Sequence, residues 1–236
     1  MGPNKLWPDH QADSFVYERN LRRKGYKLIA GLDEVGRGPL AGPVVAACVV
    51  LPPACDHRIF VDSKTISHSE RIRLNSELKR IGALVGIGIV DERDIDRFNI
   101  LQASLLAMKQ AMKSLAPQPD FLLIDGKHRV PVSIPQQTMI KGETKSSSIA
   151  AASIAAKVYR DALMEEYHLQ FPEYRFHRNK GYPTAEHRAA IKKCGPCEIH
   201  RRSFKGVREY CTKVPSSKTF KDNINNCLFP KSFPLS

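Results

Sequence analysis

Residues 43–51 (PVVAACVVL) form the apolar run that most constrains the fold of this chain. The run contains no charged residue and is rich in β-branched valine, which is typical of a strand buried on both faces of a sheet. Such a strand must be covered by other elements on both sides, so we expect an α/β fold. The chain has 236 residues, of which 42% are hydrophobic, and this is enough for one sizeable domain.

Shorter apolar runs and helical patterns alternate along the rest of the sequence. Together they predict a mixed central sheet flanked by helices. Ser67 and Glu70 have the spacing of a capping box, and Thr184 is expected to cap a later helix. Further strands are expected at residues 28–32, 84–90, 121–124 and 137–140, and helices at residues 67–80, 91–114, 148–168 and 184–193.

The sequence predicts three parts of the chain. Residues 1–27 are polar and are expected to form a helical lead-in, whereas residues 28–212 form the main domain with a basic C-terminal helical segment. Residues 213–236 are rich in Ser, Lys, Asn and Pro and are expected to be a loosely ordered tail.

The charge of the chain indicates a polyanionic partner. Its 37 Lys and Arg residues against 24 Asp and Glu give a net charge of +13. Residues 171–236 alone hold 14 basic and 5 acidic residues, so the excess is concentrated in the C-terminal part. Basic surfaces bind nucleic acids by displacing counterions from phosphates, although a merely solvated basic tail would give the same composition.

Neither the N-terminus nor the cysteines indicate export. The chain opens MGPNKLWPDHQ without an apolar run, and no stretch reaches the length of a membrane span. The pair Cys194 and Cys197 has the spacing of a redox motif but lies in a late basic segment, and one such pair is weak for zinc. We therefore expect a cytoplasmic protein.

Four acidic residues follow or end the predicted strands. Asp33 and Glu34 follow the first strand, Asp125 ends another, and Glu143 lies between the last strand and a helix. Ligand sites of α/β sheets lie at the carboxyl ends of strands, so these acids are expected to share one site. Taken alone, any one of these acids is explained by a turn or helix cap, and a turn is favoured for Asp125 before Gly126.

Such a carboxylate cluster suits metal-dependent phosphodiester hydrolysis. Two Mg²⁺ or Mn²⁺ ions bring water to phosphorus and stabilise the leaving oxygen, and hard cations need oxygen ligands. Asp33 and Glu34 point to opposite faces of a regular strand, so both bind a cation only if the strand kinks near Gly36 and Gly38. Otherwise one of them binds through water or its backbone carbonyl.

Several sequence blocks closely resemble the ribonuclease HII family and appear in that family's order. The longest are GLDEVGRGPLAGPV at residues 31–44 and AASIAAKVYRD at residues 151–161. The others are DSK at residues 62–64, LIDG at 123–126, KGE at 141–143, KGYPT at 180–184 and HRRSF at 200–204. The resemblance spans residues 28–208, and this many ordered motifs make it specific.

The resemblance implies an RNase H-like fold and an endonuclease that cleaves the RNA strand of RNA–DNA hybrids and incises 5′ to ribonucleotides embedded in duplex DNA. It implies two-metal-ion catalysis that leaves 3′-hydroxyl and 5′-phosphate ends. By position, Asp33, Glu34 and Asp125 match the family's catalytic, metal-binding acids. Glu143 stands where the family usually has Asp, as in the related ribonuclease HIII group, and its longer side chain leaves its reach to the second metal open.

The resemblance also implies substrate contacts. Gly36, Arg37 and Gly38 match a segment that contacts the ribose 2′-hydroxyl and adjoining phosphate, and Tyr182 matches a tyrosine that packs on the sugar. Without the resemblance, Tyr182 is as well explained as a half-buried loop residue. The candidate phosphate contacts are Lys64, Arg201 and Arg202, for which solvated surface charge is the alternative.

Two other functions fit parts of the sequence. A non-catalytic nucleic-acid-binding protein would explain the charge, but all four acids are present. Another phosphoryl-transfer enzyme is disfavoured because the sequence has no phosphate-binding loop and no dinucleotide fingerprint. We expect a monomer, in ribonucleotide excision repair, and leave open whether it contacts a sliding clamp.

Overall fold

The computed structural model describes residues 13–60 and 63–211. A five-stranded sheet in the order β3-β2-β1-β4-β5 forms its centre. β1 pairs with β2, and β2 with β3, in antiparallel fashion, whereas β4 is parallel to both β1 and β5. The predicted mixed sheet is therefore confirmed. The strands are β1 (Ile29–Val35), β2 (Val44–Val50), β3 (Leu84–Val90), β4 (Phe121–Asp125) and β5 (Gln136–Met139).

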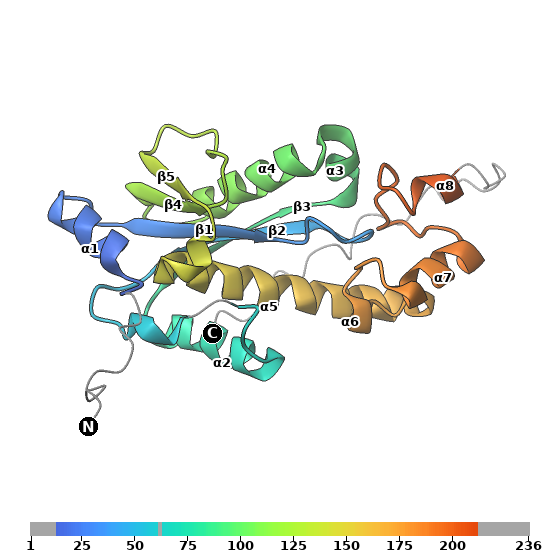
Figure 1. Cartoon of the computed structure of the whole chain (residues 1–236), viewed down its shortest axis with the longest axis horizontal. Helices are drawn as coiled ribbons and strands as arrows, with labels where there is room; N and C mark the ends of the chain where they lie inside the picture. The colour runs from blue at the N-terminus through green and yellow to red at the C-terminus, as the bar shows by residue number, and fades with distance from the viewer. Residues whose placement is uncertain (1–12, 61–62, 212–236) are drawn as a thin grey trace, which may run out of the picture.

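Helices cover both faces of the sheet (Figure 1). One face packs on α4 (Ile100–Lys113), and the other packs on α5 (Ser147–Gln170) and α2 (His68–Arg80). Because β2 lies between these two layers, each of its seven residues is buried, as its uninterrupted apolar sequence predicts. The remaining helices are α1 (Val16–Arg23), α3 (Glu92–Phe98), α6 (Phe176–Asn179), α7 (Ala185–Cys194) and α8 (Arg208–Cys211), with short 3₁₀ turns η1 (His57–Ile59), η2 (Gly142–Thr144) and η3 (Pro172–Tyr174).

The start of α5 lies directly against β1. A Cβ atom at Gly31 would come within 2.1 Å of the backbone carbon of Ser148, so only glycine permits this approach. The small residues at the start of α5, including Ala150 and Ala151, extend the same close packing. β1 and the first turns of α5 are therefore held together.

The expected helix over residues 91–114 is divided. Asn99 has φ 71°, which ends α3, and its Oδ1 accepts the N–H groups of Leu101 and Gln102, which begins α4. Ser67 and Thr184 cap their helices as predicted, accepting the N–H groups of Glu70 and His187.

The C-terminal helices α6, α7 and α8 lie beyond one end of α5 (Figure 1). The segment from Leu40 to Gly42 joins them to the sheet: Leu40 N–H donates to Gly181, and Gly42 N–H donates to Ile199. The predicted lead-in contains α1, whereas the predicted tail at residues 213–236 lies outside the described residues. In the described part of the chain, no helix combines the length and apolar character needed to cross a membrane.

Candidate active site

The two central parallel strands bring acidic residues together. Leu32 of β1 is in register with Ile124 of β4, so Asp33 and Asp125 follow at the same level of neighbouring strands. Glu143 lies in η2, soon after β5, the strand that pairs with β4 on its other side. The sheet therefore places acids from three separate segments near the carboxyl ends of its parallel strands, as the strand-end pattern predicts.

Asp33 and Glu34 both lie within a regular strand. β1 continues to Val35, and the left-handed turn comes only at Gly36, where φ is +94°. No kink separates the two acids, so their side chains leave opposite faces of the strand. Asp33 Oδ1 accepts the N–H of Glu34 at 2.7 Å, and the carboxylate of Glu34 accepts from Arg37 Nη1 at 3.0 Å.

Burial and like charge make this cluster electrostatically unfavourable without a cation. Burial holds the pKa of Asp33 well above its usual range, and the charges of Glu34 and Asp125 raise it further. Burial also raises the pKa of Glu34, against the opposing effect of Arg37. Bound divalent cations relieve this penalty, because they supply positive charge where carboxylates repel one another.

Asp125 and Glu143 influence each other's ionisation. Burial raises the pKa of Asp125, and the charge and hydrogen bond of Glu143 add to this effect, while the Gly142 N–H opposes it at 2.7 Å. Burial also acts to raise the pKa of Glu143, but its own backbone N–H and Lys64 outweigh it and leave that pKa lowered. Of the two carboxyl groups, Asp125 therefore has the raised pKa and Glu143 the lowered one.

The four carboxylates fit a divalent cation in donor chemistry. Glu143 Oε2 is buried and has no hydrogen-bond partner, so one oxygen at the site is left without its usual compensation. Lys64 Nζ lies 3.3 Å from Glu143 Oε1 and supplies positive charge there. The acids are not arranged as a finished cage: in residues 13–60 and 63–211, no group of three or more His, Cys, Asp or Glu side chains could hold a metal ion.

Arg201 holds the glycine-rich turn after β1 from the interior of the protein. Its Nη2 donates to the Gly36 carbonyl at 2.6 Å, its Nη1 donates to the Arg37 carbonyl at 3.1 Å, and its Nε donates to the Gly42 carbonyl at 3.0 Å. Arg201 is fully buried. The expectation that Arg201 contacts phosphate is therefore wrong, because its guanidinium lies inside the protein and is occupied by backbone carbonyls.

Arg160 of α5 supports the same turn. It is also fully buried, and it donates to the carbonyls of Ala41, Pro43 and Lys180. A Cβ atom at Gly36 would lie 2.3 Å from Arg160 Nε, so this glycine is required by the contact as well as by its φ. Burial lowers the pKa of Arg160 to about 10 and that of Arg201 to about 9, so both remain charged at neutral pH.

Tyr182 borders the glycine-rich turn. Its ring carbon Cε1 is 3.9 Å from the position of a Cβ atom on Gly38, and 38% of the residue is exposed. Arg37 is partly exposed beside Glu34. The structure therefore brings the exposed residues Arg37, Gly38 and Tyr182 together next to the acids, whereas Gly36 is buried against Arg160.

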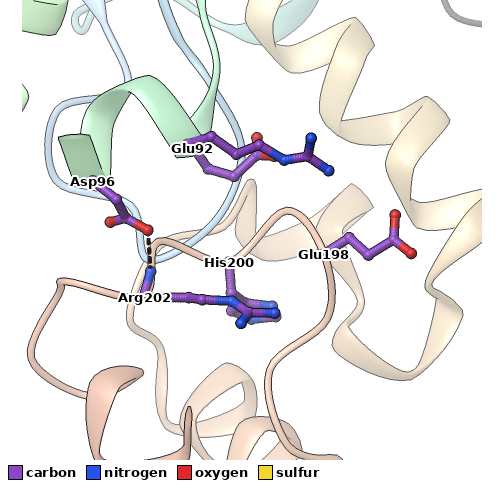
Figure 2. A pocket seen from close by; sticks show the side chains of 6 residues that line it. Glu92, Asp96, Glu198, His200 and Arg202 are labelled. Carbon is purple, nitrogen blue, oxygen red and sulfur yellow. Dashed lines mark hydrogen bonds between the residues drawn. The ribbon is translucent and has the colours of Figure 1, made fainter. Parts of the chain in front are cut away.

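Lys64 and Arg202 occupy different surroundings. Lys64 is exposed at Glu143, whereas Arg202 lines a hollow of about 290 Å³ between α3 and the C-terminal segment (Figure 2). Asp96 fixes this segment by accepting the backbone N–H of Arg202 at 2.7 Å. The hollow contains none of the four acids, and its other lining residues are Glu92, Arg93, Asp96, Glu198 and His200.

Three polar residues at the site were not singled out by sequence reasoning. The hydroxyl of Ser153 bonds to Asp33 and lies 2.9 Å from the hydroxyl of Ser63. Arg160 is the third. Each of the three is itself buried, and Ser153 and Arg160 interrupt the small apolar face of α5. That interruption is the only sequence signal of their role.

Comparison with known proteins is consistent with this geometry. The family model described as Ribonuclease HII matches residues 30–207. A Ribonuclease HII from Desulfotalea psychrophila is 58% identical over 201 residues, which cover 84% of this chain and 89% of that protein.

Solved structures show the same fold. The ribonuclease H2 of Pyrococcus horikoshii is 25% identical with a TM-score of 0.65, covering 78% of this chain and 97% of that one. The Bst RNase HIII in complex with Mn²⁺ is 19% identical with a TM-score of 0.61, covering 78% of this chain and 69% of that one. The expected RNase H-like fold is confirmed.

Proposed function

Because this chain belongs to the ribonuclease HII family, we propose that it hydrolyses the RNA strand of RNA–DNA hybrids and incises 5′ to ribonucleotides embedded in duplex DNA. The products are a 3′-hydroxyl and a 5′-phosphate. One observation carries the proposal: the parallel pair of β1 and β4 sets Asp33 and Asp125 side by side, with Glu34 and Glu143 adjoining.

Asp33, Asp125 and Glu143 would hold two divalent cations, Mg²⁺ or Mn²⁺, and Glu34, whose side chain leaves the opposite face of β1, would contribute through water or its backbone carbonyl. Such cations supply an activated water and charge stabilisation for the leaving oxygen. The unpartnered Glu143 Oε2 and the raised pKa values of Asp33 and Asp125 support this role, since both features mark negative charge that the protein itself leaves uncompensated. The Mn²⁺ complex of the Bst RNase HIII agrees with it.

Without a bound cation, Lys64 supplies part of the positive charge at Glu143. Its ammonium group is exposed and lies at Glu143 Oε1, where a cation bound by the same carboxylate would compete with it. Lys64 is proposed to contact a phosphate of the substrate beside this carboxylate. Arg202, on the neighbouring C-terminal segment, is proposed as a second phosphate contact.

The glycine-rich turn would recognise the ribose. Arg201 draws the carbonyls of Gly36 and Arg37 inward, and in a trans peptide the N–H points opposite to the carbonyl. The N–H groups of Arg37 and Gly38 therefore face away from the interior and are free to meet a 2′-hydroxyl and its phosphate. Because only RNA carries a 2′-hydroxyl, this contact would distinguish a ribonucleotide from DNA.

The basic C-terminal part supports a duplex substrate, because its excess of Lys and Arg attracts phosphates regardless of sequence. Action as a monomer, a cytoplasmic location, a role in ribonucleotide excision repair and contact with a sliding clamp remain predictions.

The proposal is tested with the full chain and a DNA duplex that contains one ribonucleotide. The duplex is incubated with Mg²⁺, with Mn²⁺ and with EDTA, and the cut is mapped to single-nucleotide resolution. We expect a cut 5′ to the ribonucleotide with either cation and no cut with EDTA, while an all-DNA duplex of the same sequence stays intact. Intact ribonucleotide-containing duplex under every condition would overturn the proposal.

A further inference from the structure

Two buried histidines form a hydrogen-bonded chain that ends at Tyr182. His187 lies in α7 and His200 in the segment that follows it, and both are almost fully buried. Their Nε2 atoms are 3.1 Å apart. His187 Nδ1 lies 2.9 Å from the carbonyl oxygen of Tyr182, and His200 Nδ1 lies 3.0 Å from the backbone nitrogen of Cys197.

The groups at the two ends fix every proton in this chain. The Tyr182 carbonyl only accepts, so His187 carries its proton on Nδ1, and in the neutral ring its Nε2 accepts. His200 must then carry its proton on Nε2, which leaves Nδ1 free to accept the N–H of Cys197. One arrangement of tautomers satisfies these three bonds, and it leaves His200 Nδ1 as the acceptor for the Cys197 thiol as well, whose Sγ lies 3.0 Å away.

The surroundings keep both rings neutral. The rings of Tyr174 and Phe176 pack on His200 with centroids 4.8 and 5.8 Å away. Burial lowers the pKa of both histidines, and that of His200 to about 3. An added proton would set two N–H groups facing each other between the rings, so the neutral chain is the stable form at pH 7.

The hydrogen-bonded histidine pair helps to hold the backbone of Tyr182 in place. The Tyr182 carbonyl accepts from Thr184 N–H at 2.8 Å as well as from His187, and the Tyr182 N–H donates to Asn179 at 2.8 Å. The ring itself is partly exposed beside Gly38, so its position depends on how its backbone is held. Without the His187 donor, the Tyr182 carbonyl would keep only the bond from the Thr184 N–H.

We propose that His187, oriented by His200, is a positioning residue that sets the Tyr182 ring against the ribose of an embedded ribonucleotide. This proposal rests on the proposed function. It assigns the pair a hydrogen-bonding role.

The test compares two nearly isosteric variants. His187→Leu removes the donor, whereas His187→Asn retains an amide N–H close to the position of Nδ1. His177→Leu is the matched control, because His177 is exposed on α6 and contacts His168 rather than the chain to Tyr182. Each variant is assayed on a duplex with one ribonucleotide and on a uniform RNA–DNA hybrid, and its Tm is recorded.

We expect His187→Leu to lower kcat on the single ribonucleotide about tenfold. A misplacement of about 1 Å at a reacting group can cost about a hundredfold in rate, so a smaller shift of the Tyr182 ring should cost less than that. The KM on that substrate should change less than about threefold, because a positioning defect lowers kcat rather than substrate binding. The kcat on the uniform hybrid should also change less than about threefold. His187→Asn should recover most of the loss, and His177→Leu should behave as wild type. Equal loss on both substrates, or no recovery by His187→Asn, would overturn the proposal.

A double variant separates positioning from general damage. In a Tyr182→Ala background, His187→Leu should cause no further loss on the single ribonucleotide, because both changes remove the same contact. A second loss of the same size would contradict positioning through Tyr182. Failure of the proposed function is distinct, since wild type would then cleave neither substrate.

The wild-type protein provides a check that does not depend on how a variant folds. Imidazole ¹⁵N spectra at pH 7 should show two neutral rings, with the proton of His187 on Nδ1 and that of His200 on Nε2. Any other tautomer, or a charged ring, would overturn the proposed chain.

Discussion

The Nη2 atom of Arg201 lies 2.6 Å from the carbonyl oxygen of Gly36, 165 residues away in the sequence. This contact ties the C-terminal segment to the turn that follows the first two catalytic candidates. The Arg201 guanidinium donates to backbone carbonyls and lies over the Phe204 ring, whereas Asp96 and Glu92 act on it only through their charge. Its main contribution is therefore the geometry that it imposes on the turn.

Replacing Arg201 with Lys should therefore impair both stability and cleavage. An ammonium group cannot reach the carbonyls of Gly36, Arg37 and Gly42 together, and a buried carbonyl left unpaired costs about 1–3 kcal/mol. Urea unfolding should show a loss of this order, and kcat on a ribonucleotide-containing duplex should fall. Arg208→Lys, at an exposed position, is the control. Unchanged stability would show that the turn holds its shape without Arg201.

Asp33→Asn should stabilise the cation-free protein. Since the folded-state pKa of Asp33 is raised, the stability linked to its neutral form is present at low pH and is lost as pH rises through that pKa. Asn imitates the neutral form, so its advantage appears above the folded pKa and disappears at low pH. Thermal unfolding in EDTA should show a higher Tm at pH 8, by roughly 2–4 °C for each kcal/mol gained. A lower Tm at pH 8 would contradict the electrostatic account.

Tyr182→Ala should reduce cleavage at a single embedded ribonucleotide. The ring borders Gly38, and without it the sugar at the junction loses its packing partner. We expect a fall of about tenfold or more in kcat/KM on this substrate, whereas Tyr182→Phe, which keeps the ring, should retain more activity. Equal rates for wild type and Tyr182→Ala would remove Tyr182 from the site.

Glu143→Asp should leave an active enzyme. The family usually has Asp at this position, and the shorter side chain retains the carboxylate, so we expect cleavage within about tenfold of wild type. Glu143→Gln, which removes the charge, should be far less active. An inactive Glu143→Asp would mean that η2 and Lys64 are adjusted to the longer side chain.

Local patterns predicted the fold well. The apolar run of β2, the capping residues Ser67 and Thr184, and the acid at the end of β4 all act through neighbours in the sequence, so their positions could be read directly. The division of one predicted helix at Asn99 was missed because the left-handed conformation of Asn99 is not marked by Gly or Pro.

The interior contacts of the site could not be read in the same way. Nothing local distinguishes Arg201 from the exposed Arg202, and only the packing of the C-terminal segment on the turn at Gly36 buries the former. The same holds for Ser153, which meets Asp33 because Gly31 lets α5 approach β1. Roles that depend on such long-range contacts become visible only in the folded structure.

The central claim is that Asp125 and its neighbours bind the cations required for cleavage, and Mn²⁺ binding to Asp125→Asn tests it most directly. Free Mn²⁺ is measured by electron paramagnetic resonance during titration of wild type and variant, each with an uncleavable all-DNA duplex. We predict that the variant binds Mn²⁺ at least about tenfold more weakly, retains duplex binding and does not cleave. Equal Mn²⁺ affinity in the two proteins, or cleavage at the wild-type rate by the variant, would contradict the account.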